Sequence, residues 1–394
     1  MMEAWRKIRL GDVCKTNMDS YSPKEEWNFV NYLDTGNITD NKIDSIQYID
    51  VKNEKLPSRA RRKVKKDSII YSTVRPNQRH FGIVKSQPEN FLVSTGFAVI
   101  DTDAQVLDAD FLYYLLTQAT LVEALHAIAE QSTSAYPSIK PSDIENLEIE
   151  IPDLATQKKI ADVLGSLDRK ITQNTEVNKN LLEQAQSIFT QEFLMLDRIP
   201  DGWQESSLLG IADYLNGLAM QKYRPKDDEQ GLPVLKIKEL RQGSCDFNSE
   251  LCSPSIKPEY IVHDGDVIFS WSGSLLVDLW CGGTCGLNQH LFKVTSSTYD
   301  KWFYYAWTNH HLQKFAAIAA DMATTMGHIK REELSKAEVL IPSQSDYDRI
   351  GGLLAPLYDL VIANRIENRK LASLRDELLP QLMSGQLDVS EVSL

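Results

Sequence analysis

The 394-residue chain has few of the features that mark secreted and membrane proteins. Its five cysteines are an odd number and lie scattered, unlike a secreted disulfide framework, so reduced thiols fit better. No uninterrupted apolar run approaches the roughly 20 residues that span a bilayer, and the first residues lack the apolar core of a signal peptide. We therefore expect a cytoplasmic protein with no membrane partner.

Motifs for catalysis are also missing. The sequence contains no NPPY-like methyltransferase motif, no GxxxxGK[ST] phosphate loop and no convincing carboxylate and lysine cluster of a nuclease. Cys281, Cys285 and His290 lie close together in CGGTCGLNQH, but zinc takes four such ligands and a fourth is not evident. We expect neither a bound metal nor a cofactor in this chain.

What the sequence does contain is an internal repeat of two long copies. WRKIRLGDV at Trp5 is echoed by WQESSLLGI at Trp203, DSIIYS by GDVIFS, FLYYLLT by WFYYAWT, and IEIPDLATQKKI by VLIPSQSDYDRI. So long a period indicates a duplicated domain rather than a solenoid. We expect globular domains at 1–151 and 199–341 and long helices at 152–198 and 342–394.

Each globule is predicted to have an α+β fold. Short β-branched runs, SIIYS, FAVID and LEIEI in the first copy and PVLKI, DVIFSW and LFKVT in the second, alternate with Gly, Pro and Asn breakers. Each copy also has one amphipathic helix, DADFLYYLLTQATLVEALHAIA or KWFYYAWTNHHLQKFAAIAA. Its tyrosines, at 113 and 114 or 304 and 305, are more often core residues than base-stacking platforms at this spacing.

The segment after each globule has a heptad seam. Apolar residues recur at alternating steps of four and three from Ile160 and again from Ile350, with two adjacent asparagines in each seam. A buried asparagine needs an amide partner, so we expect an antiparallel coiled coil that pairs Asn174 with Asn368 and Asn178 with Asn364. The alternative is two unconnected amphipathic helices.

The second helix carries residues that weaken helices. Gly351, Gly352 and Pro356 lie within its seam, so we expect a kink there or a late start near residue 357. Pro380 is expected to fray the far end, with Gly385 as the cap. Two similar α/β domains joined by such an antiparallel pair, with an internal pseudo-twofold repeat, would form a dumb-bell suited to duplex DNA with two half-sites.

Basic residues are concentrated in one part of this acidic chain, whose net charge is −13. Segment 52–85 has eleven Lys or Arg against Glu54 and Asp67. Because phosphate neutralisation is local, one basic face is enough to bind DNA, although such a run is also typical of a solvated surface. The loop STVRPNQRHFG is more specific, since Pro76 rigidifies it and its side chains are of the types that read base edges.

The second copy has SWSGSLLVDLW at the same place, without arginine, as expected if the copies read different half-sites. The loops STSAYPSIK and ATTMGHIK supply hydroxyls and a lysine for phosphates. The candidate DNA-binding residues are Arg62, Lys63, Lys65, Arg75, Asn77, Arg79, His80, Tyr136 and Lys140 in the first copy, and Trp271, Ser272, Asn288, Gln289, His290, Thr325, His328 and Lys330 in the second.

At these motifs the chain resembles the DNA-specificity (S) subunit of type I restriction-modification systems over essentially its whole length. The resemblance rests on the two domain starts, on DSIIYSTVRPNQRHFG and GDVIFSWSG, on GLNQHLFKV, on the helix start at Pro152 and Gln157, and on LMSGQLDV. The chain departs from this pattern at Tyr347, which stands where the first copy has Gln157.

The resemblance implies two target-recognition domains that bind the halves of an asymmetric, bipartite site in double-stranded DNA. It implies helices that set the spacing and dock two methyltransferase (M) subunits, with restriction (R) subunits added. The chain itself would be non-catalytic, within a complex that methylates adenine after base flipping and uses S-adenosylmethionine, ATP and Mg.

Three alternatives stay open. The chain is also compatible with a recognition subunit for a type II fused nuclease and methylase, or with a coiled-coil scaffold that binds only protein. An enzyme would need His263 or His290 to act with nearby groups, although no paired motif recurs in both copies. Those groups are Asp264, Asp266 and Cys285.

Overall fold

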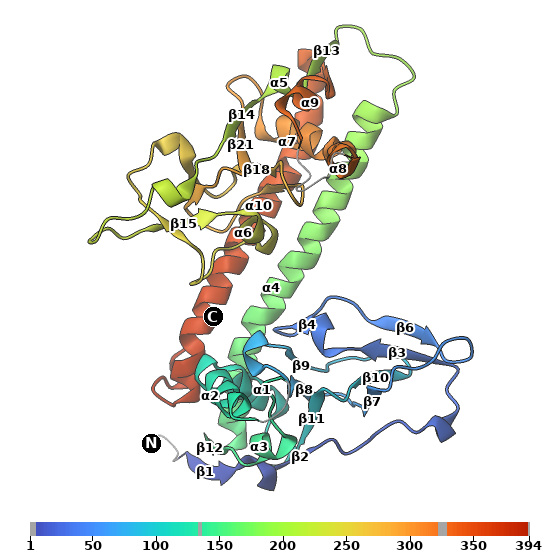
Figure 1. Ribbon diagram of the computed structural model, residues 1–394, viewed down its shortest axis with the longest axis vertical. Coiled ribbons are helices and arrows are strands. Elements are labelled where there is room, and N and C mark those ends of the chain that lie inside the picture. Colours follow the sequence, from blue (N-terminus) through green and yellow to red (C-terminus); the bar gives the residue numbers. More distant parts are fainter. Residues whose placement is uncertain (1–4, 133–135, 322–328, 393–394) are drawn as a thin grey trace. The chain divides into compact units, whose positions relative to one another are not determined.

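The computed structural model describes residues 5–132, 136–321 and 329–392. The chain divides into two compact units: unit 1 comprises Met1–Arg169 and Ser373–Leu394, and unit 2 comprises Lys170–Ala372. Each unit contains one globule and parts of two long helices, α4 (Leu154–Phe189) and α10 (Gln344–Met383), which Figure 1 shows in green and red.

Unit 1 contains two four-stranded sheets with the strand orders β2-β11-β8-β9 and β6-β3-β10-β7. All neighbouring strands are antiparallel except β3 and β10. The strands are β2 (Cys14–Thr16), β3 (Phe29–Leu33), β6 (Gln47–Asp50), β7 (Ala60–Lys63), β8 (Ile69–Ser72), β9 (Phe81–Ile83), β10 (Phe91–Ser94) and β11 (Phe97–Thr102), with the small pairs β1 (Arg6–Arg9) and β12 (Glu148–Ile151), and β4 (Ile38–Thr39) and β5 (Lys42–Ile43).

Unit 2 repeats this topology with the orders β14-β21-β18-β19 and β16-β15-β20-β17, and again one neighbouring pair, β15 and β20, is parallel. The strands are β14 (Asp213–Asn216), β15 (Leu232–Leu235), β16 (Leu251–Cys252), β17 (Ile261–Val262), β18 (Val267–Ser270), β19 (Leu276–Leu279), β20 (Cys285–Leu287) and β21 (Leu291–Thr295), with β13 (Gln204–Ser207) paired to β22 (Glu338–Ile341). The predicted duplication and fold class are thereby confirmed.

The aromatic helix of each copy is two helices, so the prediction of one is wrong. They are α1 (Ala109–Thr117) and α2 (Ala119–Glu130) in unit 1, and α7 (Lys301–His310) and α8 (Leu312–Asp321) in unit 2. At the first break Gln118 is extended, with ψ 136°. Carbonyls that lose their helical donors there accept from side chains, Tyr114 from the Thr117 hydroxyl and Leu115 from the Gln118 amide.

The tyrosines of these helices are buried, as predicted. Tyr113, Tyr114, Tyr304 and Tyr305 are each at most 8% exposed and belong to the main cores. Among the described residues no single helix is long and apolar enough to cross a membrane, and only α1 and α2, bent by 67°, reach that length and composition together. The shorter helices are α3 (Pro141–Glu145), α5 (Leu208–Ile211), α6 (Ile237–Gln242) and α9 (Arg331–Ser335).

Helix α10 is one continuous helical segment, so the expectation of a late start near residue 357 is wrong. It begins at Gln344, passes Gly351 and Pro356 and ends at Met383, beyond Pro380. Burial of the seam explains this: Ile350, Leu354 and Val361 are fully buried, and such packing outweighs the low helix propensity of Gly and Pro. The expected cap is present, since Gly385 follows the helix with φ +69°.

Within unit 2 the segments of α4 and α10 run antiparallel. The Asn174 amide donates to Asn368 Oδ1 at 2.8 Å, and the Asn364 amide donates to Asn178 Oδ1 at 2.9 Å. As the residue number increases along α4, the number of the paired residue on α10 decreases, so the two helices run in opposite directions. Asn174 and Asn178 are 4% and 6% exposed, and these are the two pairings that the seam predicts.

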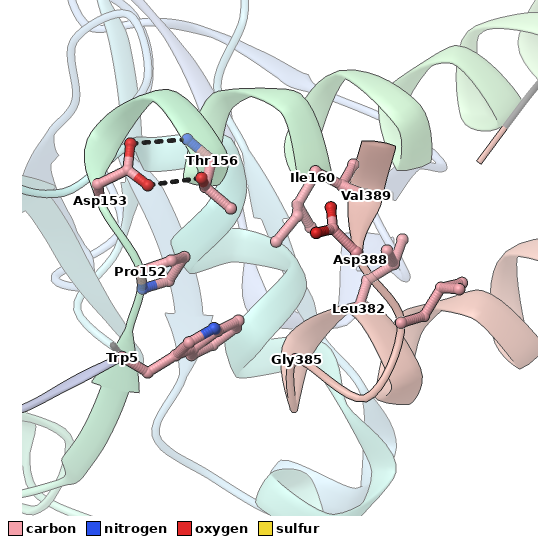
Figure 2. A pocket seen from close by; sticks show the side chains of 10 residues that line it. Trp5, Pro152, Asp153, Thr156, Ile160, Leu382, Gly385, Asp388 and Val389 are labelled. Atoms are coloured by element: carbon pink, nitrogen blue, oxygen red, sulfur yellow. Dashed lines mark hydrogen bonds between the residues drawn. The ribbon is translucent and has the colours of Figure 1, made fainter. Parts of the chain in front are cut away.

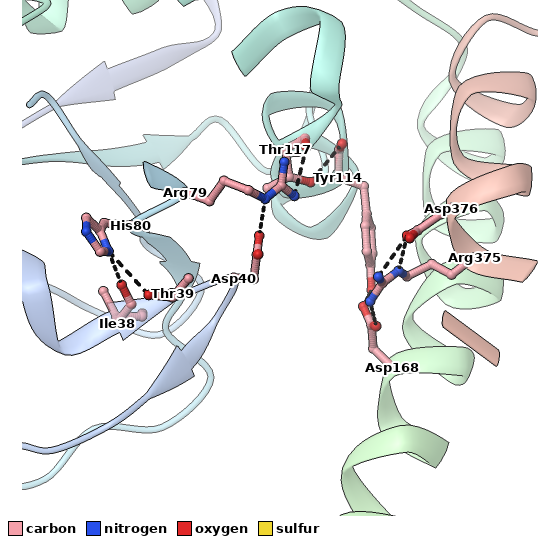
Figure 3. A network of polar contacts seen from close by, with 10 residues as sticks. All are labelled: Ile38, Thr39, Asp40, Arg79, His80, Tyr114, Thr117, Asp168, Arg375 and Asp376. Atoms are coloured by element: carbon pink, nitrogen blue, oxygen red, sulfur yellow. Dashed lines mark hydrogen bonds and ion pairs between the residues drawn. The ribbon is translucent and has the colours of Figure 1, made fainter. Parts of the chain in front are cut away.

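Within unit 1 the end of α10 meets the start of α4 through a polar network (Figure 3). Asp168 accepts from Arg375 Nη1 at 2.6 Å and from the Tyr114 hydroxyl at 2.6 Å. The neighbouring Asp168 carboxylate raises the pKa of Arg375 despite the opposing effect of burial. One carboxylate therefore ties both long helices to the aromatic helix α1.

Candidate nucleic-acid interface

The predicted recognition loop of unit 1 is a tight turn after the central strand β8. Arg75 and Arg79, both in the left-handed region with φ of 48° and 58°, flank the short 3-10 turn Pro76–Gln78. Such a conformation costs a non-glycine residue on the order of 1–3 kcal/mol. Backbone hydrogen bonds from Gln78 to Arg75 and from Arg79 to Pro76, of 2.9 and 3.0 Å, offset part of that cost.

Two of the candidate side chains on this turn point into unit 1 (Figure 3). Arg79 Nε donates to Asp40 Oδ1 at 2.7 Å, and its Nη2 lies 3.5 Å from the Thr117 carbonyl oxygen. His80 Nδ1 is 2.6 Å from the carbonyl oxygen of Ile38. These residues hold the turn against the β4–β5 hairpin and the end of α1.

The other polar side chains on the turn point outward. Arg75, Asn77 and Gln78 are exposed, and the Arg75 guanidinium lies 5.2 Å from the centre of the Tyr136 ring. Tyr136 is brought there by its own segment, because the Arg75 N–H donates to the Pro137 carbonyl at 2.9 Å. The same segment ends with the exposed Lys140.

The basic strand β7 is partly neutralised by nearby acids. Lys63 pairs with Glu25 at 2.6 Å, and Lys65 lies 3.7 Å from Asp101. Burial lowers the pKa of Arg62, whose Nε is buried and has no hydrogen-bond partner among the described residues. The positive face is therefore smaller than the count of basic residues indicates.

Unit 2 presents different side chains on the same backbone arrangement. The Ile329 N–H donates to the Trp271 carbonyl at 3.1 Å, just as the Ile139 N–H donates to the Thr73 carbonyl at 2.8 Å in unit 1. In both units, therefore, the isoleucine that precedes the lysine lies beside the turn that follows the central strand. The exposed Lys330 takes the place of Lys140, and the predicted residues Thr325 and His328 lie outside the described residues.

The residues that follow β18, Trp271 and Ser272, contact the end of β14 and the segment before β21. Trp271 Nε1 donates to Asn216 Oδ1 at 3.0 Å, and Ser272 Oγ lies 3.1 Å from His290 Nδ1. Gln289 Nε2 lies 3.3 Å from His290 Nε2. Asn288 is 7% exposed, and its side chain accepts from the His290 N–H, which makes it a support for this segment.

The acidic residues and the cysteine that an enzymatic function would need are buried or paired with other side chains in the fold. Asp264 makes two hydrogen bonds of 2.7 Å with Arg369, which hold its pKa below the usual range. Asp266 pairs with Lys293 at 2.8 Å, and Cys285 is fully buried. Across the described ranges, no group of three or more His, Cys, Asp or Glu is arranged to hold a metal ion.

The comparison with known proteins decides the family. The model of the type I restriction modification DNA specificity domain matches this chain twice, over residues 2–184 and 200–374. The chain belongs to this family. Its two matched segments correspond to the two copies of the repeat, and the resemblance predicted from the motifs is confirmed.

Individual relatives agree with this assignment. The specificity chain is 22% identical to the HindI specificity subunit of Haemophilus influenzae, over 98% of this chain and 100% of that protein. It is 27% identical to the MjaIX specificity subunit of Methanocaldococcus jannaschii, over 72% and 70%. A solved type I S subunit from M. genitalium has the same fold, with a TM-score of 0.58 at 15% identity over 96% of both chains.

Sequence reasoning missed the residues that anchor the specificity chain's second globule to α10. Arg365 Nη1 donates to Asp278 Oδ1 at 2.7 Å and to the Leu279 carbonyl at 2.9 Å, one turn before the pair of Arg369 and Asp264. Arginines four residues apart share a helix face, which is a sequence signal for such an anchor. The acids they contact are distant in sequence and carry no matching signal.

The specificity chain also has a cavity of about 280 Å³ in unit 1, where α4 begins and α10 ends (Figure 2). Trp5 lies against Gly385 on one side, and Asp153 caps α4 by accepting from Thr156 on the other. None of the candidate DNA-binding residues lines it.

Proposed function

We propose that this non-catalytic specificity chain recognises an asymmetric, bipartite sequence in double-stranded DNA, one half with each globule. It docks two adenine methyltransferase (M) subunits and, in the complete system, restriction (R) subunits. S-adenosylmethionine, ATP and Mg are used by those partners. The alternatives, a subunit for a type II fused nuclease and methylase or a protein-binding scaffold, differ in their partners.

The observation that supports two different half-sites is the pair of equivalent turns with unlike side chains. The backbone bonds at Ile139 and Ile329 match, yet the turn that starts at Thr73 in unit 1 carries Arg75 and Asn77, whereas the turn that starts at Trp271 in unit 2 carries no arginine or asparagine. Arginine and asparagine make paired hydrogen bonds with base edges, whereas tryptophan offers an apolar face. Two such surfaces select different base pairs, which makes the whole site asymmetric.

The long helices support the proposed spacing and docking roles. α4 and α10 have 36 and 40 residues, and their buried Asn pairs specify one register in unit 2. A helix pair with a fixed register has a fixed length, as a spacer between half-sites requires. Exposed apolar side chains on these helices, among them Val177, Leu353 and Leu360, are available for docked subunits.

The test is the methylated sequence in cells that express the chain with its methyltransferase. We expect a bipartite adenine motif that neither protein produces alone. Arg75→Ala should relax one half of the motif, and the double substitution Gln289→Ala, His290→Ala the other. Arg61→Ala is the matched control, because Arg61 is an exposed arginine of the same basic segment.

The alternatives predict other results. If the chain assembles with its partner and no methylated sequence appears, the scaffold is supported and the proposal fails. If the partner that copurifies is one polypeptide with both nuclease and methylase activity, the chain serves a type II system. Native mass spectrometry of the purified complex gives the number of methyltransferase subunits, for which we expect two.

A further inference from the structure

Arg75 and Tyr136 form an exposed cation–π pair on the surface of unit 1. The guanidinium lies over the Tyr136 ring at 5.2 Å from its centre, although the tyrosine is 59% exposed. Arg79 and Lys63 have carboxylate partners, whereas Arg75 has none among the described residues. The charge of Arg75 is therefore available to a ligand while the guanidinium lies over the ring.

The backbone on both sides of this pair is fixed. The Arg75 N–H donates to the Pro137 carbonyl, and Val74 pairs with Ser138 in an isolated β-bridge. The Arg75 carbonyl accepts from Gln78, which closes the turn on the other side. The backbones that carry the two side chains are thus joined before any ligand binds, which lowers the ordering cost of binding.

We propose that Arg75, stacked on Tyr136, reads a guanine in the half-site of the first globule. The inference rests on the proposed function, since it requires that this globule binds duplex DNA. A planar guanidinium presents two parallel N–H donors, and guanine O6 and N7 form the matching pair of acceptors in the major groove. The stacked ring fixes the orientation of that fork.

A phosphate contact is the competing role for Arg75. A phosphate requires positive charge but no fixed plane, and the same basic segment offers exposed residues such as Arg61 and Lys66 for that purpose. A stacked arginine next to an exposed asparagine, Asn77, has the composition of a base-reading surface.

The experiment uses the full chain bound to its methyltransferase subunits and duplexes that carry its methylated motif. Each guanine of the motif is replaced in turn by 7-deazaguanine, which pairs normally but lacks the N7 acceptor. We expect one position in one half at which the replacement weakens binding by at least about fivefold. Arg75→Ala should bind the two duplexes equally.

Three further variants separate the reading of a base from a contact with phosphate. Tyr136→Phe should keep the discrimination and Tyr136→Ala should reduce it, because only the ring is needed. Arg61→Ala should keep it in full. Tyr136 and Arg61 are both exposed, so we expect the three variants to unfold at the temperature of the wild type, which would confirm that each variant folds.

Two results would overturn the inference alone. Arg75→Ala could weaken all duplexes equally and lower the salt dependence by about one charge, as a phosphate contact does. Alternatively, no guanine in the motif could be sensitive to the loss of N7. A wild-type complex that prefers no sequence at all would overturn the proposed function as well, which is a distinct outcome.

Discussion

The hydroxyl of Tyr347 accepts a hydrogen bond of 2.8 Å from the backbone N–H of Asp300, the N-cap residue of helix α7. In unit 1 the side chain of Gln157 accepts the corresponding bond of 2.9 Å from the backbone N–H of Asp108, the N-cap residue of α1. The position at which the second copy departs from the first therefore makes the same bond with a different side chain.

Removing this bond should lower the free energy of unfolding slightly in unit 2 and more strongly in unit 1. Tyr347→Phe deletes two exposed hydrogen bonds to Asp300, one accepted from its N–H and one donated to its carboxylate, so we expect the free energy of unfolding to fall by about 1–2 kcal/mol. Gln157 is fully buried and also donates to the carbonyls of Val106 and Pro152, so Gln157→Leu should cost about 2–4 kcal/mol. Urea unfolding followed by tryptophan fluorescence measures both, and equal losses would contradict the comparison.

The two neighbouring glycines of α10 should respond oppositely to alanine. A methyl group on Gly351 would lie 2.9 Å from Nε1 of the buried Trp302, so Gly351→Ala should lower the melting temperature, with a net cost of about 1 kcal/mol. Gly352 is exposed and has no atom within 4 Å of that position, so Gly352→Ala should raise stability by up to about 1 kcal/mol. Two changes of the same sign would show that this segment packs differently.

The amide pair in the helix seam should show strong coupling. Asn178→Leu or Asn364→Leu alone leaves a polar amide facing an apolar side chain, at a cost of about 1–3 kcal/mol. The double variant removes both polar groups and should recover most of that loss, with a less specific register. A double-mutant cycle by chemical denaturation measures the coupling, and additive losses would mean that the amides do not pair.

The role of Arg79 can be separated from that of a DNA contact through its partner. If Arg79 mainly holds the turn, Asp40→Ala should relax the same half of the methylated motif as Arg79→Ala, each by several-fold, because the bond between them is lost. If Arg79 contacts DNA, freeing it from Asp40 should strengthen binding instead. Glu54→Ala removes an exposed acid of the same basic segment and serves as the control.

Acid should weaken the attachment of the second globule to α10. Arg369 lowers the pKa of Asp264, so this pair stabilises the fold above the unfolded-state pKa of about 4, and the stabilisation is lost as the pH falls through the lowered pKa. Arg369→Met should therefore differ most from the wild type at pH 7, and the gap should close below pH about 4. Lys7→Met, from an exposed pair with Glu148, should show little difference at any pH.

The repeat, the main strands and the helix seam were predictable because they depend on local periodicity. Asn178 and Asn364 show this well, since their spacing within two seams was enough to pair them. The continuity of α10 was not predictable from Gly351 and Pro356, because propensity there is outweighed by burial of the seam. Composition cannot reveal which residues a side chain meets in the folded unit.

The turn after β8 shows the same limit at the candidate site. Arg75 and Arg79 have the same chemistry and lie four residues apart, yet one points outward and the other inward. Their difference depends on Asp40 and Tyr136, which are distant in sequence and were placed beside the turn only by the sheet topology. The residue types of a reading surface could be predicted, but not their orientations.

Leu382 and Met383, at the end of α10, are buried in the core of unit 1 together with residues as early as Leu10. During synthesis the ribosome must therefore deliver nearly the whole chain before the first globule can bury its last apolar side chains. A nascent chain that stops early would expose the apolar surface that these residues cover, which chaperones and proteases recognise. The first globule is begun first but completed last, so only a chain translated through Met383 presents it in finished form.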